Sequence, residues 1–422
     1  MISTLADVVR VLEVDLFQSP DGLFREGDGF ARSQALMAAL GDPQDAVPAV
    51  HVAGTAGKGT VATAIARAAS GPLRVGLHLS PHVYDLRERF AVDGELATEA
   101  EVVALLEAVL PTIRVMASGP HGPPTSYEVS LALALLHFRN RGCDLMVVET
   151  GLGGLYDTTN TISRDDKLAV VVRIDHDHEA VLGSTLTEIA RQKAGILTRD
   201  GEAVVLRPET RAVEAVLADE AERRRCRVRW VEPGGGPGTV AHLAEDRAVA
   251  EAALDVLGAR TGHDLTTRLP PLDALTLPGR YERVRLAGGG EAILDGAHTP
   301  LKLTAFVDRL HRTHGARPRP WVFGCKPDKK ARAMLEIVLA EASSLCVVGF
   351  PIRGGDVPAG PSTDPAVLAE MAAELAPAVP VTVAPDPAAA AAFVGAAGSG
   401  DAVPVVGSFY LLAALRPLLA PS

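Results

Sequence analysis

The chain alternates short, almost wholly apolar stretches with longer segments in which apolar residues recur at helical spacing. In the first part of the chain, the apolar stretches predict strands at residues 47–53, 74–79, 144–149, 168–174, 202–206 and 227–230. The segments between them predict helices, among them residues 61–70, 99–110, 129–138, 186–193 and 243–261. Strands that are apolar throughout are typical of parallel sheets covered on both faces. The alternation therefore predicts an α/β fold with a doubly wound, mostly parallel sheet.

A second alternation begins after Leu277-Pro278-Gly279-Arg280, where the composition of the chain changes. Its strands are predicted at residues 292–295, 321–324, 345–349, 379–383 and 403–406. A chain of 422 residues is long enough for two domains with separate cores. We therefore predict a larger domain at residues 1–280 and a smaller α/β domain at residues 281–422.

Composition excludes several classes of partner. The net charge of −11 opposes binding to a phosphate backbone, and an aromatic content of 4% offers few stacking platforms for bases. The first residues lack a basic segment followed by an apolar run, so we expect no signal peptide, and the absence of long apolar runs predicts no membrane-spanning segment. The four cysteines show no C-x-x-C spacing, which is typical of reduced thiols in a cytoplasmic protein.

The first candidate for chemistry is the loop Gly54-Thr55-Ala56-Gly57-Lys58-Gly59-Thr60, which lies between a predicted strand and a predicted helix. Glycines let backbone N–H groups approach phosphate oxygens, and the helix N-terminus adds positive potential. The match to the general P-loop pattern is imperfect, because Gly59 separates Lys58 from the hydroxyl of Thr60 and the loop is short. An ordinary strand-to-helix turn is the alternative.

Other reactive residues follow strands of the same predicted sheet. Ser80, Glu149 and the run Asp175-His176-Asp177-His178 each come at or just after a strand end. Ligands bind at the carboxyl ends of parallel strands, and Mg²⁺ prefers oxygen ligands together with nucleotide phosphates. Taken alone, Glu149 could be a capping carboxylate and His178 a structural histidine. Lys193, which precedes Ala194-Gly195-Ile196, could equally close a helix as a solvated lysine.

These residues together resemble a known family. The stretch from His51 to Thr60 is similar to the ATP loop of folylpolyglutamate synthase/dihydrofolate synthase, in the Mur ligase superfamily. Further blocks resemble the family in the same order along nearly the whole chain: Ser80-Pro81-His82, Arg87-Glu88-Arg89, Glu149 to Gly154, Asp157-Thr-Thr-Asn160, Asp177-His178, Leu182-Gly183, Glu188 to Ile196, Leu277 to Arg280, Leu294 to His298 and Val406 to Tyr410.

The resemblance implies an N-terminal P-loop ATPase domain and a C-terminal Rossmann-like ligase domain, with ATP bound between them. It implies an ATP-dependent ligase that activates a small carboxylic acid as an acyl phosphate and joins it to the amino group of an amino acid. ATP and Mg²⁺ are the implied cofactors. A monomer is also implied, with no nucleic-acid or membrane partner.

The resemblance further assigns roles to single residues. Lys58, His178 and Lys193 are the implied catalytic residues, with Lys193 carbamylated. The implied Mg²⁺ ligands are Ser80, Glu149 and His178. The implied cofactor-binding residues are Gly54, Thr55, Gly57, Lys58, Gly59, Thr60, Arg280, Asp295 and His298.

Several flanking residues depart from the family pattern. Ala56 and Thr299 stand where the family usually has Asn, Leu155 where it has Arg, Leu79 where it has Thr, and Thr150 where it has Val. These departures leave open the same ligase chemistry on a non-folate acceptor in specialised metabolism. A small-molecule kinase or nucleotide-hydrolysing switch, and a binding protein that has lost catalysis, are further alternatives. The blocks around Lys193, Arg280 and His298 argue against the kinase.

Overall fold

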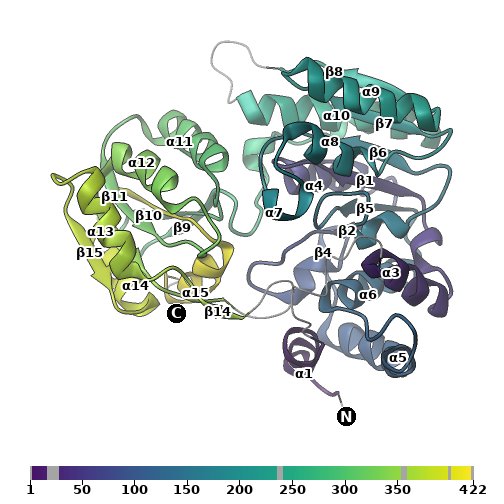
Figure 1. The fold of residues 1–422 in the computed structure, drawn as a ribbon, viewed down its shortest axis with the longest axis horizontal. Helices are drawn as coiled ribbons and strands as arrows, with labels where there is room; N and C mark the ends of the chain where they lie inside the picture. Colours follow the sequence, from purple (N-terminus) through teal and green to yellow (C-terminus); the bar gives the residue numbers. More distant parts are fainter. Residues whose placement is uncertain (1, 17–27, 235–240, 353–358, 398–400, 420–422) are drawn as a thin grey trace. The chain divides into compact units, whose positions relative to one another are not determined.

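The computed structural model describes residues 2–16, 28–234, 241–352, 359–397 and 401–419. The chain divides into two compact units, Met1–Leu275 and Thr276–Ser422 (Figure 1).

An eight-stranded sheet forms the centre of the first unit, with strand order β4-β3-β2-β5-β1-β6-β7-β8. All neighbouring strands are parallel except for the antiparallel pairs β2–β3 and β3–β4. The strands are β1 (Ala49–Ala53), β2 (Val75–His78), β3 (Ala91–Val92), β4 (Glu95–Leu96), β5 (Leu145–Glu149), β6 (Leu168–Val171), β7 (Glu202–Leu206) and β8 (Arg227–Val231).

Helices cover both faces of this sheet. The helices are α1 (Leu5–Arg10), α3 (Asp28–Ala39), α4 (Lys58–Ala69), α5 (Glu99–Ala117), α6 (Ser126–Asn140), α7 (Glu179–Leu182), α8 (Leu186–Ala194), α9 (Arg211–Arg224) and α10 (Ala241–Thr261). A π-helical turn, η1 (Val11–Asp15), follows α1. Short 3₁₀ turns are η2 (Pro43–Asp45), η3 (Leu86–Arg89), η4 (Thr158–Thr161), η5 (Thr266–Arg268) and η6 (Leu272–Ala274).

Alternate strand residues enter different cores. Val50 and Val52 of β1 pack with α4 and α10, whereas Ala49 packs with α5 and α6 on the other side. On β6, Ala169 and Val171 pack with α8 and α9. Because successive strand side chains point to opposite faces, this division shows a sheet buried on both sides.

The second unit contains a six-stranded sheet with strand order β15-β12-β11-β16-β10-β9, parallel except at the β9 edge. Its strands are β9 (Glu282–Arg285), β10 (Glu291–Asp295), β11 (Arg319–Phe323), β12 (Ala342–Val348), β15 (Val381–Ala384) and β16 (Ala402–Val406). A separate pair comprises β13 (Pro351–Ile352) and β14 (Gly360–Pro361). The helices are α11 (Pro300–His314), α12 (Ala331–Glu341), α13 (Pro365–Leu375), α14 (Pro387–Ala397) and α15 (Phe409–Leu419). Helices α11, α12 and α13 share one core with the sheet.

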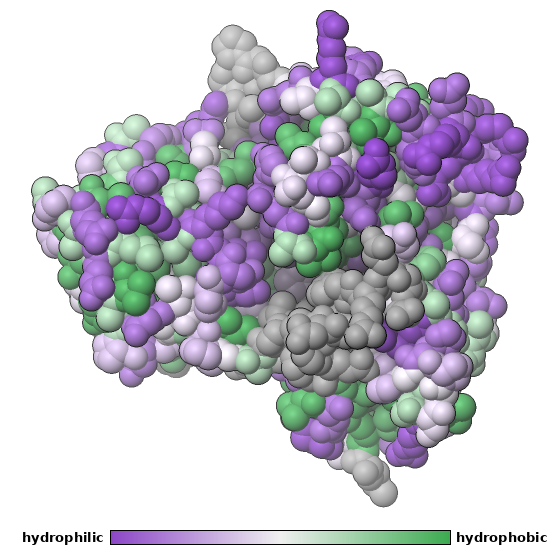
Figure 2. Space-filling view, in the orientation of Figure 1, coloured by the Kyte–Doolittle hydropathy of each residue, from purple (hydrophilic) through white to green (hydrophobic). Residues whose placement is uncertain are grey.

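The fold class predicted from the sequence is confirmed. Among the described residues, the strands that the sequence did not predict are the short antiparallel pairs β3–β4 and β13–β14 and the edge strand β9. All four cysteines are free and buried. Hydrophilic side chains gather over β8 and α9 (Figure 2), where arginines and carboxylates alternate. No helix in the described ranges is long and apolar enough to cross a bilayer.

Candidate active site

Four neighbouring strands of the first unit bring the predicted chemistry to one edge of the sheet. Strands β2, β5, β1 and β6 are consecutive in the sheet and parallel. Ser80 follows β2, Glu149 ends β5, Gly54 follows β1 and Asp175 follows β6. The carboxyl ends of parallel strands meet at one edge, which is where α/β sheets bind ligands.

The glycine loop turns sharply from β1 into α4. Gly54 has a φ of +154°, and a Cβ there would lie 2.2 Å from Cγ2 of Val172. Gly57 has a φ of +88° and is the N-cap of α4, with no side-chain hydrogen bond to the cap. The N-cap residue therefore has no side chain that could cap the first N–H groups of α4. Uncapped N–H groups at a helix N-terminus, behind a glycine turn, favour a bound anion.

Backbone and side-chain hydrogen bonds hold this loop to the end of β6. The Thr55 N–H donates to the carbonyl of Arg173 at 2.7 Å. The Thr55 hydroxyl donates to the Asp175 carbonyl at 2.9 Å and accepts from the Asp175 N–H at 3.0 Å. The Arg173 guanidinium is in turn held by Glu245 of α10. The loops after β1 and β6 are thus tied together.

Two lysines converge on this loop from different helices. Nζ of Lys58, in the first turn of α4, donates to the Gly54 carbonyl at 3.1 Å. Nζ of Lys193, in the last turn of α8, donates to the same carbonyl oxygen at 2.9 Å. Lys193 is only 3% exposed, so it is not a solvated lysine that merely closes a helix. The structure therefore places Lys193 against the glycine loop.

Glu149 and Ser80 form the part of the edge that fits a metal ion. Glu149 is 2% exposed, and its Oε2 accepts a hydrogen bond from the Ser80 N–H at 3.1 Å. Oγ of Ser80 is buried and has no hydrogen-bond partner among the residues that the structure describes. A buried hydroxyl without a partner is costly unless something else binds it. A hydroxyl beside a buried carboxylate is a suitable oxygen pair for Mg²⁺.

His178, the third predicted metal ligand, lies on the loop after β6. It is exposed, has a φ of +52°, and its Nε2 lies 3.7 Å from Oδ1 of Asp177. Within the described residues, no group of three or more His, Cys, Asp or Glu side chains is arranged to hold a metal ion. The structure thus joins Ser80 to Glu149 and does not build a complete set of such side chains around them.

In the second unit, two predicted residues lie beside the ring of Phe409. The guanidinium carbon of Arg280 lies 5.4 Å from the centre of the Phe409 ring, and the His298 ring lies 6.1 Å from it. A Cβ on Gly296 would lie 2.3 Å from this ring, so only glycine fits there. His298 Nδ1 is 2.7 Å from the Gly296 carbonyl, which assigns the proton to Nδ1.

Asp295, at the end of β10, shares this cluster. Its carboxylate accepts hydrogen bonds from the N–H groups of Tyr281 at 2.8 Å and Ala297 at 2.9 Å. Burial raises the pKa of Asp295 to about 6, against the lowering effect of these hydrogen bonds and of the Arg280 charge. A carboxylate at a strand end, beside a histidine and an arginine, is suited to bind a hydroxylated and phosphorylated ligand.

Sequence reasoning did not identify two residues that shape these clusters. Phe409 belongs to a stretch that resembles the family, but nothing in the sequence indicated that its ring lies beside Arg280 and His298. Asp246 of α10 packs against the glycine loop, with Oδ1 only 2.1 Å from where a Cβ on Gly57 would lie. No sequence signal pointed to Asp246, because the contact depends on how α10 packs against α4.

Comparison with known proteins agrees with this arrangement. Residues 279–409 match the family model described as Mur ligase, glutamate ligase domain. The folylpolyglutamate synthase of Lacticaseibacillus casei is 30% identical over 362 residues, which cover 78% of this chain and 82% of that protein. The dihydrofolate synthase/folylpolyglutamate synthase of Bacillus subtilis is 37% identical over 197 residues, which cover 46% of this chain but only 45% of that protein.

Solved structures show the same fold over nearly the whole chain. Mycobacterium tuberculosis folylpolyglutamate synthase, complexed with ADP and AMPPCP, has a TM-score of 0.81 at 26% identity and covers 99% of this chain and 98% of its own. The bifunctional folylpolyglutamate synthase/dihydrofolate synthase of Yersinia pestis, complexed with AMPPNP and Mn ion, has a TM-score of 0.77 at 26% identity, with 99% and 98% covered. The chain described here therefore belongs to the folylpolyglutamate synthase/dihydrofolate synthase family of ATP-dependent ligases.

Proposed function

We propose that this protein joins the carboxylate of a folate-type substrate to the amino group of glutamate at the expense of ATP. The observation that carries the proposal is the sheet edge of the first unit. There a helix N-terminus with a glycine N-cap and Lys58 lies behind a glycine turn, beside strands that lead to Ser80 and Glu149. Family membership supplies the substrate class, and no comparison favours a non-folate acceptor.

The glycine loop is the proposed phosphate site. Gly54, Thr55, Gly57 and Gly59 let the backbone approach the phosphates, while Lys58 and Thr60 offer an ammonium and a hydroxyl. This arrangement is supported by the glycine N-cap of α4, which leaves room for an anion at the helix N-terminus. In the second unit, Arg280, Asp295 and His298 are proposed to contact the phosphates and ribose of the nucleotide. The contacts of Arg280 and His298 with Phe409, and the effect of the Arg280 charge on Asp295, support a common ligand for the three.

Mg²⁺ is the proposed metal, held by Ser80, Glu149 and His178 with the nucleotide phosphates. The buried hydroxyl of Ser80 beside Glu149 supports the first two ligands. His178 is the least supported of the three, because it is exposed in the structure. A bound Mg²⁺ supplies positive charge that stabilises the transferring phosphoryl group.

Lys193 is proposed to act as a carbamate. A second ammonium donating to the Gly54 carbonyl would place two cations side by side and next to Mg²⁺. In the carbamylation step the neutral amine attacks CO₂, a C–N bond forms and one proton is released to solvent. The product is an anion with two oxygens, which suits a hard cation.

The reaction itself needs two transfers. A carboxylate oxygen of the acid attacks the γ-phosphorus of ATP, forming an O–P bond and releasing ADP. The neutral amine of glutamate then attacks the acyl carbon, the bond to the phosphate-bearing oxygen breaks, inorganic phosphate leaves and the amine loses one proton to solvent. The protein's task is to align the reactants and to neutralise the phosphoryl charge, which Lys58 does at the glycine loop.

A substrate panel tests the proposal. The purified protein is incubated with ATP, Mg²⁺ and pairs of acids and amino acids, and amide products are identified by mass spectrometry. We expect a glutamyl product from dihydropteroate or tetrahydrofolate with glutamate, and none without ATP. Products only from acids unrelated to folate would overturn the proposed substrate while keeping the ligase chemistry. A monomeric state and a cytoplasmic location stay predictions, to be checked by light scattering and by fractionation.

A further inference from the structure

A buried polar network lies directly behind the loop that follows Glu149. His51 of β1, Thr150 and Thr159 are each no more than 1% exposed. Nε2 of His51 lies 2.7 Å from Oγ1 of Thr159 and 3.0 Å from Oγ1 of Thr150. The Thr159 hydroxyl donates to Oδ1 of Asp157, which is 7% exposed. Such a buried polar chain is costly to keep unless its members are hydrogen-bonded.

The direction of these hydrogen bonds follows from the chemistry of their members. Burial raises the pKa of Asp157, but the Leu152 N–H, the Thr159 N–H and the Thr159 hydroxyl all donate to its carboxyl oxygens, which favours the ionised form. The Thr159 hydroxyl therefore gives its proton to Asp157. The remaining lone pairs of Thr159 Oγ1 must then accept from His51, which assigns the proton to Nε2. Nδ1 of His51 has no hydrogen-bond partner, and a proton there would be a buried donor with nothing to bind. Burial also holds the pKa of His51 well below its ordinary value, so the ring is neutral.

At the other end of the network, Asp157 binds main-chain N–H groups, one of them close in sequence to Glu149, the candidate metal ligand. Oδ2 of Asp157 accepts from the Leu152 N–H at 2.7 Å, and Oδ1 accepts from the Thr159 N–H at 3.0 Å. Leu152 lies three residues after Glu149. In the sheet, Glu149 pairs with Val52 of β1, which directly follows His51 in the chain. The network therefore connects β1, which leads into the glycine loop, with the chain that leaves β5.

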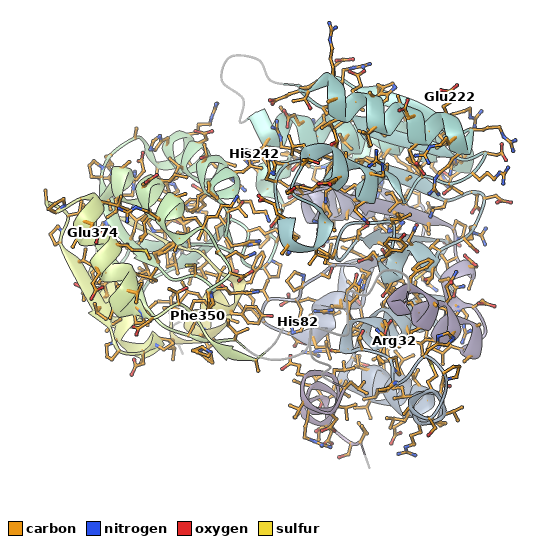
Figure 3. The ribbon with its side chains drawn as sticks, in the orientation of Figure 1. Arg32, His82, Glu222, His242, Phe350 and Glu374 are labelled. Carbon is orange, nitrogen blue, oxygen red and sulfur yellow. The ribbon has the colours of Figure 1, made fainter. Side chains whose placement is uncertain are left out.

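The same turn is fixed on its other side. The Thr158 hydroxyl lies 3.0 Å from the Ser33 hydroxyl, which donates to Glu128 at 2.8 Å. Arg32 of α3 donates to the same carboxylate at 2.9 Å and lies between α3 and α6 (Figure 3). Helices α3 and α6 thus brace η4 from outside, while His51 binds it from the sheet. Neither contact touches the sheet edge directly.

We propose that His51 and Asp157, joined through Thr159, are positioning residues that hold the Gly151–Leu152 main chain and thereby aim the Glu149 carboxylate at the metal. The inference rests on the proposed metal-binding role of Glu149. Groups that orient a metal ligand from behind commonly change metal affinity by about 10–100-fold when removed. A network that served folding alone would lower stability without changing metal affinity in the folded protein.

The first test is spectroscopic and independent of turnover. Nitrogen-15 NMR of the histidine side chains reports which ring nitrogen carries the proton. We expect a neutral His51 with its proton on Nε2, unchanged between pH 5 and 8. In Thr159→Val, which cannot accept this hydrogen bond, the Nε2 resonance should shift. A proton found on Nδ1 would overturn the proposal.

The second test measures metal affinity. Mn²⁺ is titrated into the full chain saturated with AMPPNP, for wild type and for His51→Leu, Thr159→Val and Thr159→Ser. We expect the first two variants to bind Mn²⁺ about 10–100-fold more weakly, and Thr159→Ser, which keeps the hydroxyl, to bind as wild type. His137→Leu is the matched control, because His137 is a buried histidine of α6 in the same unit outside the network.

The outcomes separate the two proposals. Equal Mn²⁺ affinity in His51→Leu, Thr159→Val and His137→Leu would overturn the positioning role. A wild-type protein that binds no metal with AMPPNP and forms no amide would instead overturn the proposed function. If His51→Leu does not fold, Thr159→Val against Thr159→Ser decides the matter alone, because those two variants differ from each other mainly in the hydroxyl.

Discussion

At the scale of single residues, two lysine side chains bind one carbonyl oxygen of the glycine loop. Lys58 and Lys193 both donate to Gly54, one from the start of α4 and one from the end of α8. Lys58 is proposed to meet the phosphate oxygens there as an ammonium group, whereas Lys193 is proposed to act there as a carbamate. A third ionisable residue, Asp295, lies in the second unit and has its pKa raised by burial. Each residue gives a separate prediction.

Lys58→Ala should abolish most turnover while the protein stays folded. Loss of one positive group at a transferring phosphoryl typically costs several kcal/mol, so kcat should fall by about 100-fold or more. The Tm should stay close to that of wild type, because Lys58 is only partly buried. The matched control is Arg67→Ala, which removes an exposed cation from the same helix and should leave kcat unchanged. ADP production by Lys58→Ala at the wild-type rate would contradict the phosphate-site assignment.

Lys193→Ala should be inactive and should regain part of its activity when a short carboxylate such as acetate is added. The reason is that the proposed carbamate is an anion, and the small carboxylate can occupy the space that the missing side chain leaves. The measurement is the rate of ADP formation over a range of acetate concentrations, with chloride as the control salt. Wild-type activity in Lys193→Ala without any addition would contradict the proposed carbamate.

Asp295 should make nucleotide use sensitive to pH. Its pKa of about 6 means that the carboxylate, which is the form proposed to accept hydrogen bonds from ribose hydroxyls, is lost as the pH falls through about 6. We expect kcat/KM for ATP to fall below that pH, since this ratio reports groups of the free enzyme. In Asp295→Asn the inflection near pH 6 should disappear and the KM for ATP should rise. An unchanged inflection in that variant would assign it to another group.

The raised pKa of Asp295 also affects stability, and in the opposite direction from its effect on activity. Because the folded pKa lies above the unfolded value of 3.8, the folded state binds the proton more tightly. The stability contributed by this group is fully present below pH 3.8 and is lost as the pH rises through about 6. Asp295→Asn should flatten this part of the curve of unfolding free energy against pH.

At the scale of elements, the packing of α10 against the start of α4 restricts the glycine loop. Gly57→Ala adds a Cβ that would lie 2.1 Å from Asp246 Oδ1, at a φ of +88°. We expect a higher KM for ATP as well as a lower Tm. Gly262→Ala is the matched control, because Gly262 has a similar φ of +75° but nothing within 4 Å. Gly262→Ala should therefore cost only the backbone strain of an alanine at positive φ, about 1–2 kcal/mol, and should leave the KM for ATP unchanged. Equal KM values in both variants would show that Asp246 does not restrict the loop.

The strands differ in how well the sequence predicts them. The strands β1, β5 and β6 are buried on both faces, so their apolar runs predicted them well. Strand β9 was not predicted, because it is a sheet edge with the polar sequence Glu-Arg-Val-Arg. Strands β3 and β4 have only two residues each, which is too short to show a period.

At the scale of the whole molecule, the fold class and the family followed from the sequence, while the close contacts did not. The sequence predicted that Ser80 and Glu149 lie at the same edge of the sheet, because both follow parallel strands. That their strands β2 and β5 are neighbours was known only from the strand order in the structure. Contacts of Thr159 with His51 and of Asp246 with Gly57 join segments far apart in the chain. Such contacts depend on tertiary packing, for which a local pattern has no signal.

The central claim is that this chain makes an amide through an acyl phosphate. The most direct measurement uses an acid substrate whose carboxyl oxygens are oxygen-18, with ATP, Mg²⁺ and glutamate. Mass spectrometry then follows the label in the inorganic phosphate and in the amide. We expect one oxygen-18 atom to appear in phosphate for each amide formed. Unlabelled phosphate, or label transferred to AMP, would contradict it.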